Sequence, residues 1–317
     1  MIPGGTGFLG QALAARLVAR GDDVVALCRT RRPVVPGSRS VVWDARTPGS
    51  WTAALEGADA VVHLTGRRVD VRPTRSNVDE LISSRVGPVT LVGEAVRRCA
   101  DPPRVWLQAS SLAIFGDTGD AVLDETSPPS GIGPREMVTV CLAWEHAFEL
   151  ATRDVGRKVL LRMGIAIGGR DDPATTQLAR LTRLGLGGTI GSGRQWVSWV
   201  GLDDLVRVML AALDDEGMAG TYHVASPNPV TNAEMMATYR RLLAAPFGLP
   251  SPDLLVRLGA PLLGSSASLA LTGRRAAPKR LLEHGFVFQQ PTFEPALQSA
   301  LSRSGLLGEP GLRRRRP

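Results

Sequence analysis

The sequence predicts an α/β fold, a doubly wound parallel sheet with helices on both faces, followed by a smaller C-terminal domain. Two features of the 317-residue chain lead to this prediction. Short apolar runs alternate with helical patterns through the first half, which is typical of βαβ units. A glycine-rich turn at residues 4–10 opens the series, where the first strand of such a sheet passes into its first helix.

The elements of this sheet follow in chain order. Only Met1 and Ile2 precede the turn, although a first strand normally needs about five residues. The strand is therefore either shortened or begins upstream of residue 1, and we favour the second interpretation. Apolar runs predict the further strands Val24–Cys28, Ser40–Trp43, Ala60–Leu64, Val105–Ala109 and Lys158–Met163. Apolar residues at helical spacing predict helices over Phe8–Ala19, Val78–Cys99 and Met137–Thr152, and Gly87-Pro88 is a candidate interruption of the second.

Composition narrows the functional class. The hydrophobic content of 44% suits an ordinary globular protein, and no apolar run approaches the roughly 20 residues of a membrane helix. Three cysteines without metal-like spacing and four scattered histidines predict no metal site and fit a reducing cytoplasm. Arg313–Arg316 supply four charges of the net +7, so we expect a solvated tail rather than a nucleic-acid or membrane surface.

The spacing of Gly4, Gly7 and Gly10 predicts a Rossmann dinucleotide site. Gly4 permits a tight turn, Gly7 lets the backbone approach a diphosphate, and Gly10 allows the helix to pack closely on the sheet. The helix N-terminus then presents backbone N–H groups and its positive dipole end to the phosphates. The other cofactor-binding residues expected in this turn are Thr6, Phe8 and Leu9.

The residues after the second strand predict NADP(H) rather than NAD(H). An acidic residue at this place would bind the ribose 2′-hydroxyl, whereas arginine pairs with a 2′-phosphate. Here Cys28 is followed by Arg29-Thr30-Arg31-Arg32, without a carboxylate. The planar guanidinium groups of Arg29 and Arg31 suit phosphate geometry, although surface arginines in an Arg-rich protein are the alternative interpretation.

The pattern changes after Gly168, where glycine- and proline-rich stretches alternate with the helical pieces Asp203–Leu213 and Asn232–Ala244. We expect residues 1–168 to form the NADP-binding Rossmann domain, to which residues 196–225 return. Residues 169–195 and 226–305 would form a substrate-side domain. Residues 306–317 show no periodicity and are expected to be a flexible basic tail.

Later motifs resemble a known family. The stretches that carry the resemblance are 184–196 (LGLGGTIGSGRQW), 198–204 (SWVGLDD), 225–230 (ASPNPV) and 275–281 (RAAPKRL), followed by Gly285-Phe286. Between Gly4 and about Leu301 the chain resembles the YfcH-like sugar-nucleotide epimerase group. This group belongs to the atypical extended short-chain dehydrogenases and has its own small C-terminal domain.

The resemblance implies roles for residues in four places. Asp44 would lie near the adenine, and the loop Leu64-Thr65-Gly66 would pass the adenosine ribose. Ser110 and Ser111, at the end of the fifth strand, resemble the serine pair from which extended dehydrogenases draw the donor to the substrate carbonyl. Met163, after Arg162, lies on the stretch that leads toward the nicotinamide.

The usual catalytic pair, Tyr-x-x-x-Lys, is missing. No tyrosine of this chain lies four residues before a lysine, and Met137 and Cys141 occupy the corresponding positions. Met137 cannot carry a proton, whereas Cys141 could act as a base or nucleophile only if its pKa were lowered; a buried structural cysteine is the alternative. Glu136, next to the vacant tyrosine position, is a second candidate proton carrier. We interpret His63 as structural.

Substrate contacts are expected from three residues. Phe115 replaces a tyrosine of the resembled group near the cleft, and Arg194 and Trp196 follow a glycine-rich loop that could clamp an anionic or planar molecule. The sequence thus predicts an NADP(H)-binding oxidoreductase or epimerase-like enzyme for a small carbonyl or hydroxyl substrate, with redox-neutral isomerisation, cyclisation or dehydration as variants. The alternative is an NADP-sensing or scaffold protein with vestigial chemistry. A homodimer through Met137–Thr152 is compatible with either function.

Overall fold

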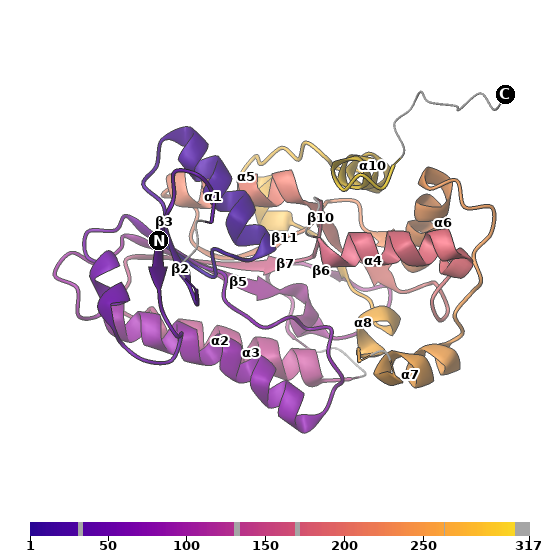
Figure 1. Cartoon of the computed structure of the whole chain (residues 1–317), viewed down its shortest axis with the longest axis horizontal. Helices are drawn as coiled ribbons and strands as arrows, with labels where there is room; N and C mark the ends of the chain where they lie inside the picture. The colour runs from indigo at the N-terminus through magenta and orange to yellow at the C-terminus, as the bar shows by residue number, and fades with distance from the viewer. Residues whose placement is uncertain (31–33, 130–133, 169–171, 263, 308–317) are drawn as a thin grey trace.

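The central feature of the computed structural model is a parallel sheet. The model describes residues 1–30, 34–129, 134–168, 172–262 and 264–307 (Figure 1). The strands of the sheet lie in the order β3-β2-β1-β4-β5-β7-β11, because β1 pairs with β2 while its backbone carbonyl groups accept hydrogen bonds from β4. Their bounds are β1 Ile2–Pro3, β2 Val25–Cys28, β3 Arg39–Val42, β4 Ala60–His63, β5 Val105–Ser111, β7 Arg157–Met163 and β11 Gly220–Val224.

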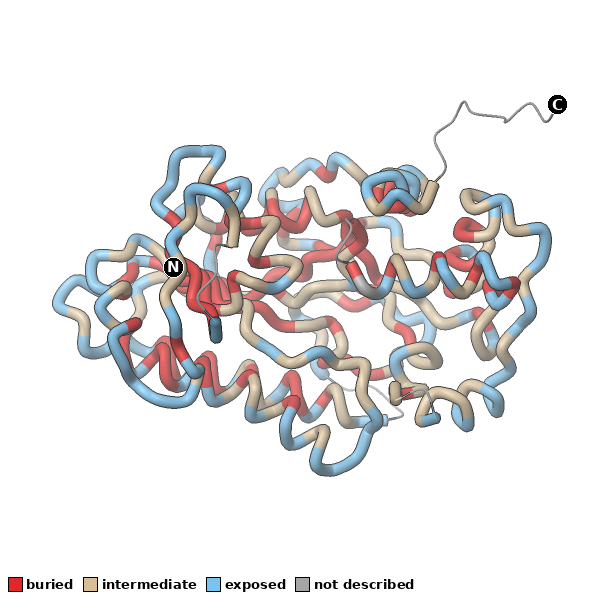
Figure 2. The backbone as a smooth tube through the Cα atoms, viewed as in Figure 1, coloured by how far each residue is buried: buried red, intermediate tan, exposed pale blue. Residues whose placement is uncertain are grey.

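Helices cover both faces of this sheet. On one face lie α1 (Phe8–Arg20) and α5 (Leu202–Asp214), and on the other lie α2 (Arg75–Val96) and α3 (Glu136–Ala151) (Figure 1). Each helix pair buries its apolar side in a separate cluster on its own face of the strands (Figure 2). The predicted doubly wound α/β fold is therefore confirmed, and the apolar side of α3 is used within the chain.

The candidate interruption at Gly87-Pro88 does not occur, because α2 continues through both residues. A residue before proline is normally pushed out of helical geometry, in part by its Cβ, and Gly87 has none. Pro88 and Val89 are buried against the core, so their burial offsets the loss of one helical hydrogen bond.

The shorter elements build the C-terminal side of the molecule around a third cluster, which contains Trp199, Tyr239 and Phe293. Parallel pairing of β13 with β6 joins this side to the segment after β5. The bounds of these elements are η1 Ser50–Ala54, η2 Leu112–Phe115, β6 Val122–Leu123, β8 Ile165–Ile167, α4 Pro173–Leu181, η3 Thr182–Leu186, β9 Trp196–Val197, β10 Trp199–Gly201, β12 Val230–Thr231, α6 Asn232–Leu242, α7 Asp253–Leu262, α8 Ser268–Leu271, β13 Arg275–Ala276, α9 Lys279–Glu283 and α10 Phe293–Arg303.

A buried carboxylate fixes the segment before α10. Asp204, in the first turn of α5, is fully buried and accepts hydrogen bonds from the backbone N–H groups of Gln289 and Gln290 at 2.9 and 2.8 Å. Arg207 pairs with it at 2.7 Å.

No helix of the described residues is long and apolar enough to cross a membrane.

We expect Asp204→Ala to lower the free energy of unfolding by about 3 kcal/mol, because it leaves two backbone donors and Arg207 without their partner. Urea unfolding followed by circular dichroism measures the change. The matched control is Asp203→Ala, which removes only an exposed ion pair with Arg303 and is expected to cost less than about 1 kcal/mol. Equal losses in the two variants would contradict this account.

Candidate cofactor and active site

The glycine turn between β1 and α1 packs against the end of β4. Gly4 has a φ of +86°, and a Cβ on it would lie 2.7 Å from the carbonyl carbon of Leu64. A Cβ on Gly10 would lie 2.6 Å from the carbonyl oxygen of Gly4. Both contacts are too close for any side chain, so glycine is required at these two positions.

The N-terminus of α1 is open to a ligand. Its N-cap residue is Gly7, and no side chain of the described residues caps it. Gly7 is exposed, and Thr6, Phe8 and Leu9 are half-buried around it. Gln11 donates a hydrogen bond to the Thr6 carbonyl at 2.9 Å and leaves the amides of the first turn without side-chain acceptors. Unpaired N–H groups at a helix N-terminus bind phosphates.

The loop after β4 lies beside this turn. Leu64 and Thr65 are half-buried and Gly66 is exposed. The Thr65 hydroxyl lies 3.2 Å from Nε2 of His63, whose ring stacks on Trp106 in the core. Burial lowers the pKa of His63 to about 3, so this imidazole is neutral and structural, as expected from the sequence.

The expected adenosine contacts also lie at the carboxyl ends of the strands, after β2 and β3. Arg29 is exposed directly after β2 and forms no ion pair with any described residue. Arg31 lies outside the described residues. The Asp44 carboxylate, after β3, accepts from the Arg46 and Thr47 amides at 2.8 and 2.9 Å, and these hydrogen bonds lower its pKa to about 2. It therefore stays ionised while it shapes its own loop.

The two serines at the end of β5 have different partners. Ser110 donates a hydrogen bond to Oε1 of Glu145 at 2.5 Å. Glu145, on α3, also forms two hydrogen bonds with the guanidinium of Arg162 on β7, at 3.0 and 2.8 Å. Ser111 instead accepts a hydrogen bond from the Ala113 amide at 3.1 Å, which leaves its hydroxyl proton free for a substrate. Met163 lies opposite Ser111 in the β5–β7 pairing.

The structure argues against a basic or nucleophilic role for Cys141. The side chain is fully buried, and burial, followed by the charge of Glu145, raises the pKa of its thiol to about 12. A thiol that stays protonated can neither attack nor take up a proton at neutral pH. Glu136 is the better candidate, because its Oε2 atom is buried and has no hydrogen-bond partner among the described residues.

The three expected substrate residues do not form one group. Phe115 is fully buried, with its ring against Arg162 and His223, so its side chain presents no surface for the expected substrate contact. Trp196 donates a hydrogen bond from Nε1 to Asp120 at 2.7 Å. Arg194 is exposed, and its guanidinium bonds to no described residue.

Two arginines near this site were not among the predicted residues. Arg85 of α2 is buried with its guanidinium 5.0 Å from the centre of the Trp144 ring, and Arg274 precedes β13 and donates to Thr272 at 3.0 Å. The sequence signal for Arg85 is a charged residue on the apolar side of a helix, one turn after Leu81. Nothing local in the sequence singles out Arg274.

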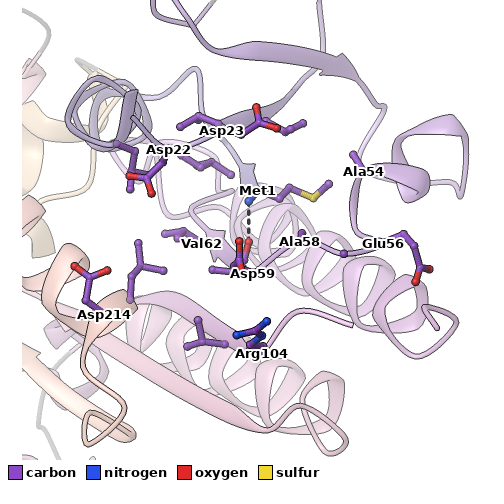
Figure 3. Close-up of a pocket in the computed structure, with 18 of the residues that line it drawn as sticks. Met1, Asp22, Asp23, Ala54, Glu56, Ala58, Asp59, Val62, Arg104 and Asp214 are labelled. Carbon is purple, nitrogen blue, oxygen red and sulfur yellow. Dashed lines mark hydrogen bonds between the residues drawn. The ribbon is translucent and has the colours of Figure 1, made fainter. Parts of the chain in front are cut away.

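A cavity of about 850 Å³ lies at the opposite ends of the strands, around Met1 (Figure 3). The N-terminal amine of Met1 donates a hydrogen bond to the Ala60 carbonyl at 2.7 Å there, and Asp22, Asp23 and Asp59 line the cavity. Parallel sheets bind nucleotides beyond the carboxyl ends of their strands. This cavity is at the amino ends, so the cofactor site is not placed there.

Comparison with known proteins agrees with this geometry. Residues 1–225 match the model of the NAD dependent epimerase/dehydratase family, and residues 251–300 match a domain of unknown function, DUF1731. The chain belongs to the NAD dependent epimerase/dehydratase family. Its fold is the Rossmann type found in the short-chain dehydrogenases.

Relatives match over almost the whole chain. Epimerase family protein Mb2239 of Mycobacterium bovis is 32% identical, covering 96% of this chain and 98% of its own. The SDR39U1 homolog of Arabidopsis thaliana, described as chloroplastic, is 30% identical over 95% of this chain and 86% of its own. The crystal structure of human epimerase family protein SDR39U1 with NADPH has a TM-score of 0.82 at 29% identity, over 95% of this chain and 98% of that one.

We expect Gly10→Ala to weaken dinucleotide binding at least about tenfold and to destabilise the fold by about 2 kcal/mol, because the new Cβ meets the Gly4 carbonyl. Fluorescence titration with NADPH and urea unfolding measure the two effects. The control is Gly259→Ala on α7, where a Cβ meets no atom and stability is expected to stay equal or rise slightly. Unchanged affinity in Gly10→Ala would contradict the assignment of this turn.

Proposed function

We propose that this protein is an NADP(H)-dependent oxidoreductase or epimerase for a small carbonyl or hydroxyl substrate, which works without a Tyr–Lys pair. The observation that carries the proposal is the free hydroxyl proton of Ser111 at the same sheet edge as the uncapped N-terminus of α1. A bound nicotinamide supplies or accepts the hydride in such reactions. The chain's own residues bind the cofactor, orient the substrate and move the proton.

The cofactor fits the residues at this edge. No side chain of the described residues caps the N-terminus of α1, so a diphosphate can accept hydrogen bonds from its first amides. Arg29 is exposed and unpaired among the described residues, and so is available for a 2′-phosphate. The human relative whose structure contains NADPH supports the same choice.

Ser111 would donate its hydroxyl proton to the substrate oxygen and polarise the carbonyl carbon. Ser110 cannot share this role, because its proton is committed to Glu145. The Glu145–Arg162 pair would hold β5, β7 and α3 in register, so that Ser111 keeps its position. Glu136, with one carboxylate oxygen unpartnered, or a water molecule, would carry the proton in place of the missing tyrosine.

One observation favours a second function, an NADP-sensing or scaffold protein without turnover. The positions of the missing pair are filled by Met137 and by a Cys141 thiol with a pKa of about 12, and neither group can carry a proton at neutral pH. Both functions require the cofactor to bind. They differ in whether the nicotinamide absorbance changes when carbonyl compounds are added.

We expect Ser111→Ala to lower turnover about 10²-fold or more without changing NADPH affinity, because it removes a donor to the developing oxyanion. The measurement is the absorbance of reduced nicotinamide during incubation with pooled small carbonyl metabolites. Ser110→Ala is the matched comparison; it should mainly lower stability, by about 1 kcal/mol, through the lost hydrogen bond to Glu145. Full activity in Ser111→Ala would refute the role of this residue. No absorbance change with the native protein would favour the NADP-sensing or scaffold function.

Arg29→Ala should weaken NADPH binding about tenfold and leave NADH binding unchanged, because only NADPH carries the 2′-phosphate. Parallel fluorescence titrations with the two dinucleotides give the ratio of the dissociation constants. Arg16→Ala, which removes an exposed charge from the side of α1, is the control. A similar loss for both cofactors would rule out the 2′-phosphate assignment.

A further inference from the structure

The helix α7 carries its leucines on the side that faces solvent. Leu254, Leu255, Leu258 and Leu262 follow the three- and four-residue spacing that places side chains on one side of a helix, and they are between 61 and 81% exposed. A surface helix normally packs such a stripe against the core, but α7 has no buried residue (Figure 2). These four residues are called the leucine face below.

The remaining contacts of α7 hold the helix in this orientation. Val256 and Pro261 are half-buried, and Arg72, in the loop after β4, donates a hydrogen bond to the Pro261 carbonyl. Just before the helix, the Ser251 carbonyl accepts a hydrogen bond from the Gly191 amide at 2.8 Å. Both ends of α7 are therefore attached to the molecule, and the leucine face is left without a partner among the described residues.

A second group of exposed apolar side chains adjoins the start of α7. The Leu249 amide donates to the Gly185 carbonyl at 2.8 Å, and a Cβ on Gly185 would lie 2.8 Å from the Phe247 ring. These contacts join the segment before α7 to η3. The exposed members of this η3 group are Leu184, Leu186, Phe247 and Leu249. Such an accumulation of exposed apolar side chains is typical of a binding surface.

The chain around both groups carries positive charge. Residues 173–201 and 243–271, which contain both groups, include four arginines, no lysine and a single acidic residue, Asp253. Arg257 pairs with Asp253 at 2.7 Å. The other three are exposed and form no ion pair with any described residue: Arg180, Arg183 and Arg194. A molecule that complements this surface combines apolar groups with negative charge.

This charge decides between two occupants of the surface. Two copies of a chain in a symmetric dimer use the same patch, so a second copy would bring these positive charges against one another. A membrane with anionic phospholipids instead offers negative headgroups directly above apolar acyl chains. Helices with one apolar side and basic residues nearby lie in this boundary. The observations therefore favour a membrane surface over a second copy.

We propose that the leucine face and the η3 group bind the surface of a membrane that contains anionic phospholipid. The helix α7 would lie parallel to the surface, with its leucines at the boundary between headgroups and acyl chains, while Arg180 and Arg183 contact lipid phosphates. The proposal goes beyond the proposed function, because it concerns where the protein binds and not what it converts.

The test is co-sedimentation of the full chain with vesicles of phosphatidylcholine, or of an equal mixture of phosphatidylcholine and phosphatidylglycerol. The native protein is expected to bind the mixed vesicles at least about tenfold more strongly, since each arginine near an anionic surface strengthens binding. Leu254→Ser with Leu258→Ser should weaken this binding at least about tenfold, because two side chains no longer insert. Arg180→Gln should weaken binding to the mixed vesicles about fivefold and leave binding to neutral vesicles unchanged.

The matched control is Leu282→Ser with Val287→Ser, which removes two exposed apolar side chains outside both groups and should leave vesicle binding unchanged. Both double variants alter exposed side chains only, so each is expected to keep the Tm of the native protein. Every variant retains Arg313–Arg316, so any attraction of this tail to anionic lipid is the same throughout.

Three outcomes of the vesicle experiment would overturn the proposal: no binding of the native protein to the mixed vesicles, equal binding to both kinds of vesicle, or unchanged binding after Leu254→Ser with Leu258→Ser. Light scattering tests the other occupant. A native dimer that dissociates in the same double variant would assign the leucine face to a second copy and overturn the membrane proposal.

NADPH titration separates this proposal from the proposed function. Vesicle binding by a protein with no affinity for NADPH would refute the proposed function and leave the membrane surface standing. NADPH affinity without vesicle binding would refute the membrane surface alone.

Discussion

The contact between the glycine turn and the end of β4 is the constraint on which the cofactor site depends. Gly4 passes the Leu64 carbonyl with no room for a Cβ, and Gly10 passes Gly4 in the same way. These approaches bring the start of α1 to the carboxyl edge of the sheet and place the loop after β4 beside it. The first amides of the helix, which no side chain of the described residues caps, are thereby brought to the carboxyl ends of the strands.

The ion pair of Glu145 with Arg162 is the second interaction on which the site depends, because it fixes the strand ends around Ser111. The ion pair of Glu145 with Arg162 joins α3 to β7, and the hydrogen bond from Ser110 joins both to β5. The pair has two good hydrogen bonds and a third from the serine, which compensates the desolvation of its charges. The Glu145 carboxylate of α3 thus holds β5 and β7 together. Ser111 follows Ser110 directly, and its hydroxyl donates to no described residue.

Local patterns were enough to predict β2, β3, β4, β5 and β7, the helices on both faces and the glycine turn, because each depends on spacing within a few residues. The strand β11 was not predicted. The sequence left the continuity of α2 at Gly87-Pro88 open, because tertiary burial of Pro88 decides it. Phe115 was expected to contact the substrate near the cleft, but packing against His223 and Arg162 encloses its side chain. Arg274 was missed for a similar reason: pairing of β13 with β6, far apart in sequence, fixes its segment, and Ala276 of β13 packs in one cluster with Cys141 of α3.

The full burial of Cys141 bears on how this protein meets oxidants and electrophiles. A thiolate, rather than a thiol, reacts with peroxides and alkylating compounds, and reactivity further requires access. At the lysine position of the missing pair this chain carries sulfur that is both protonated and enclosed. Cys141 is consequently resistant to oxidation, and covalent inhibitors that react with thiols are not expected to modify it.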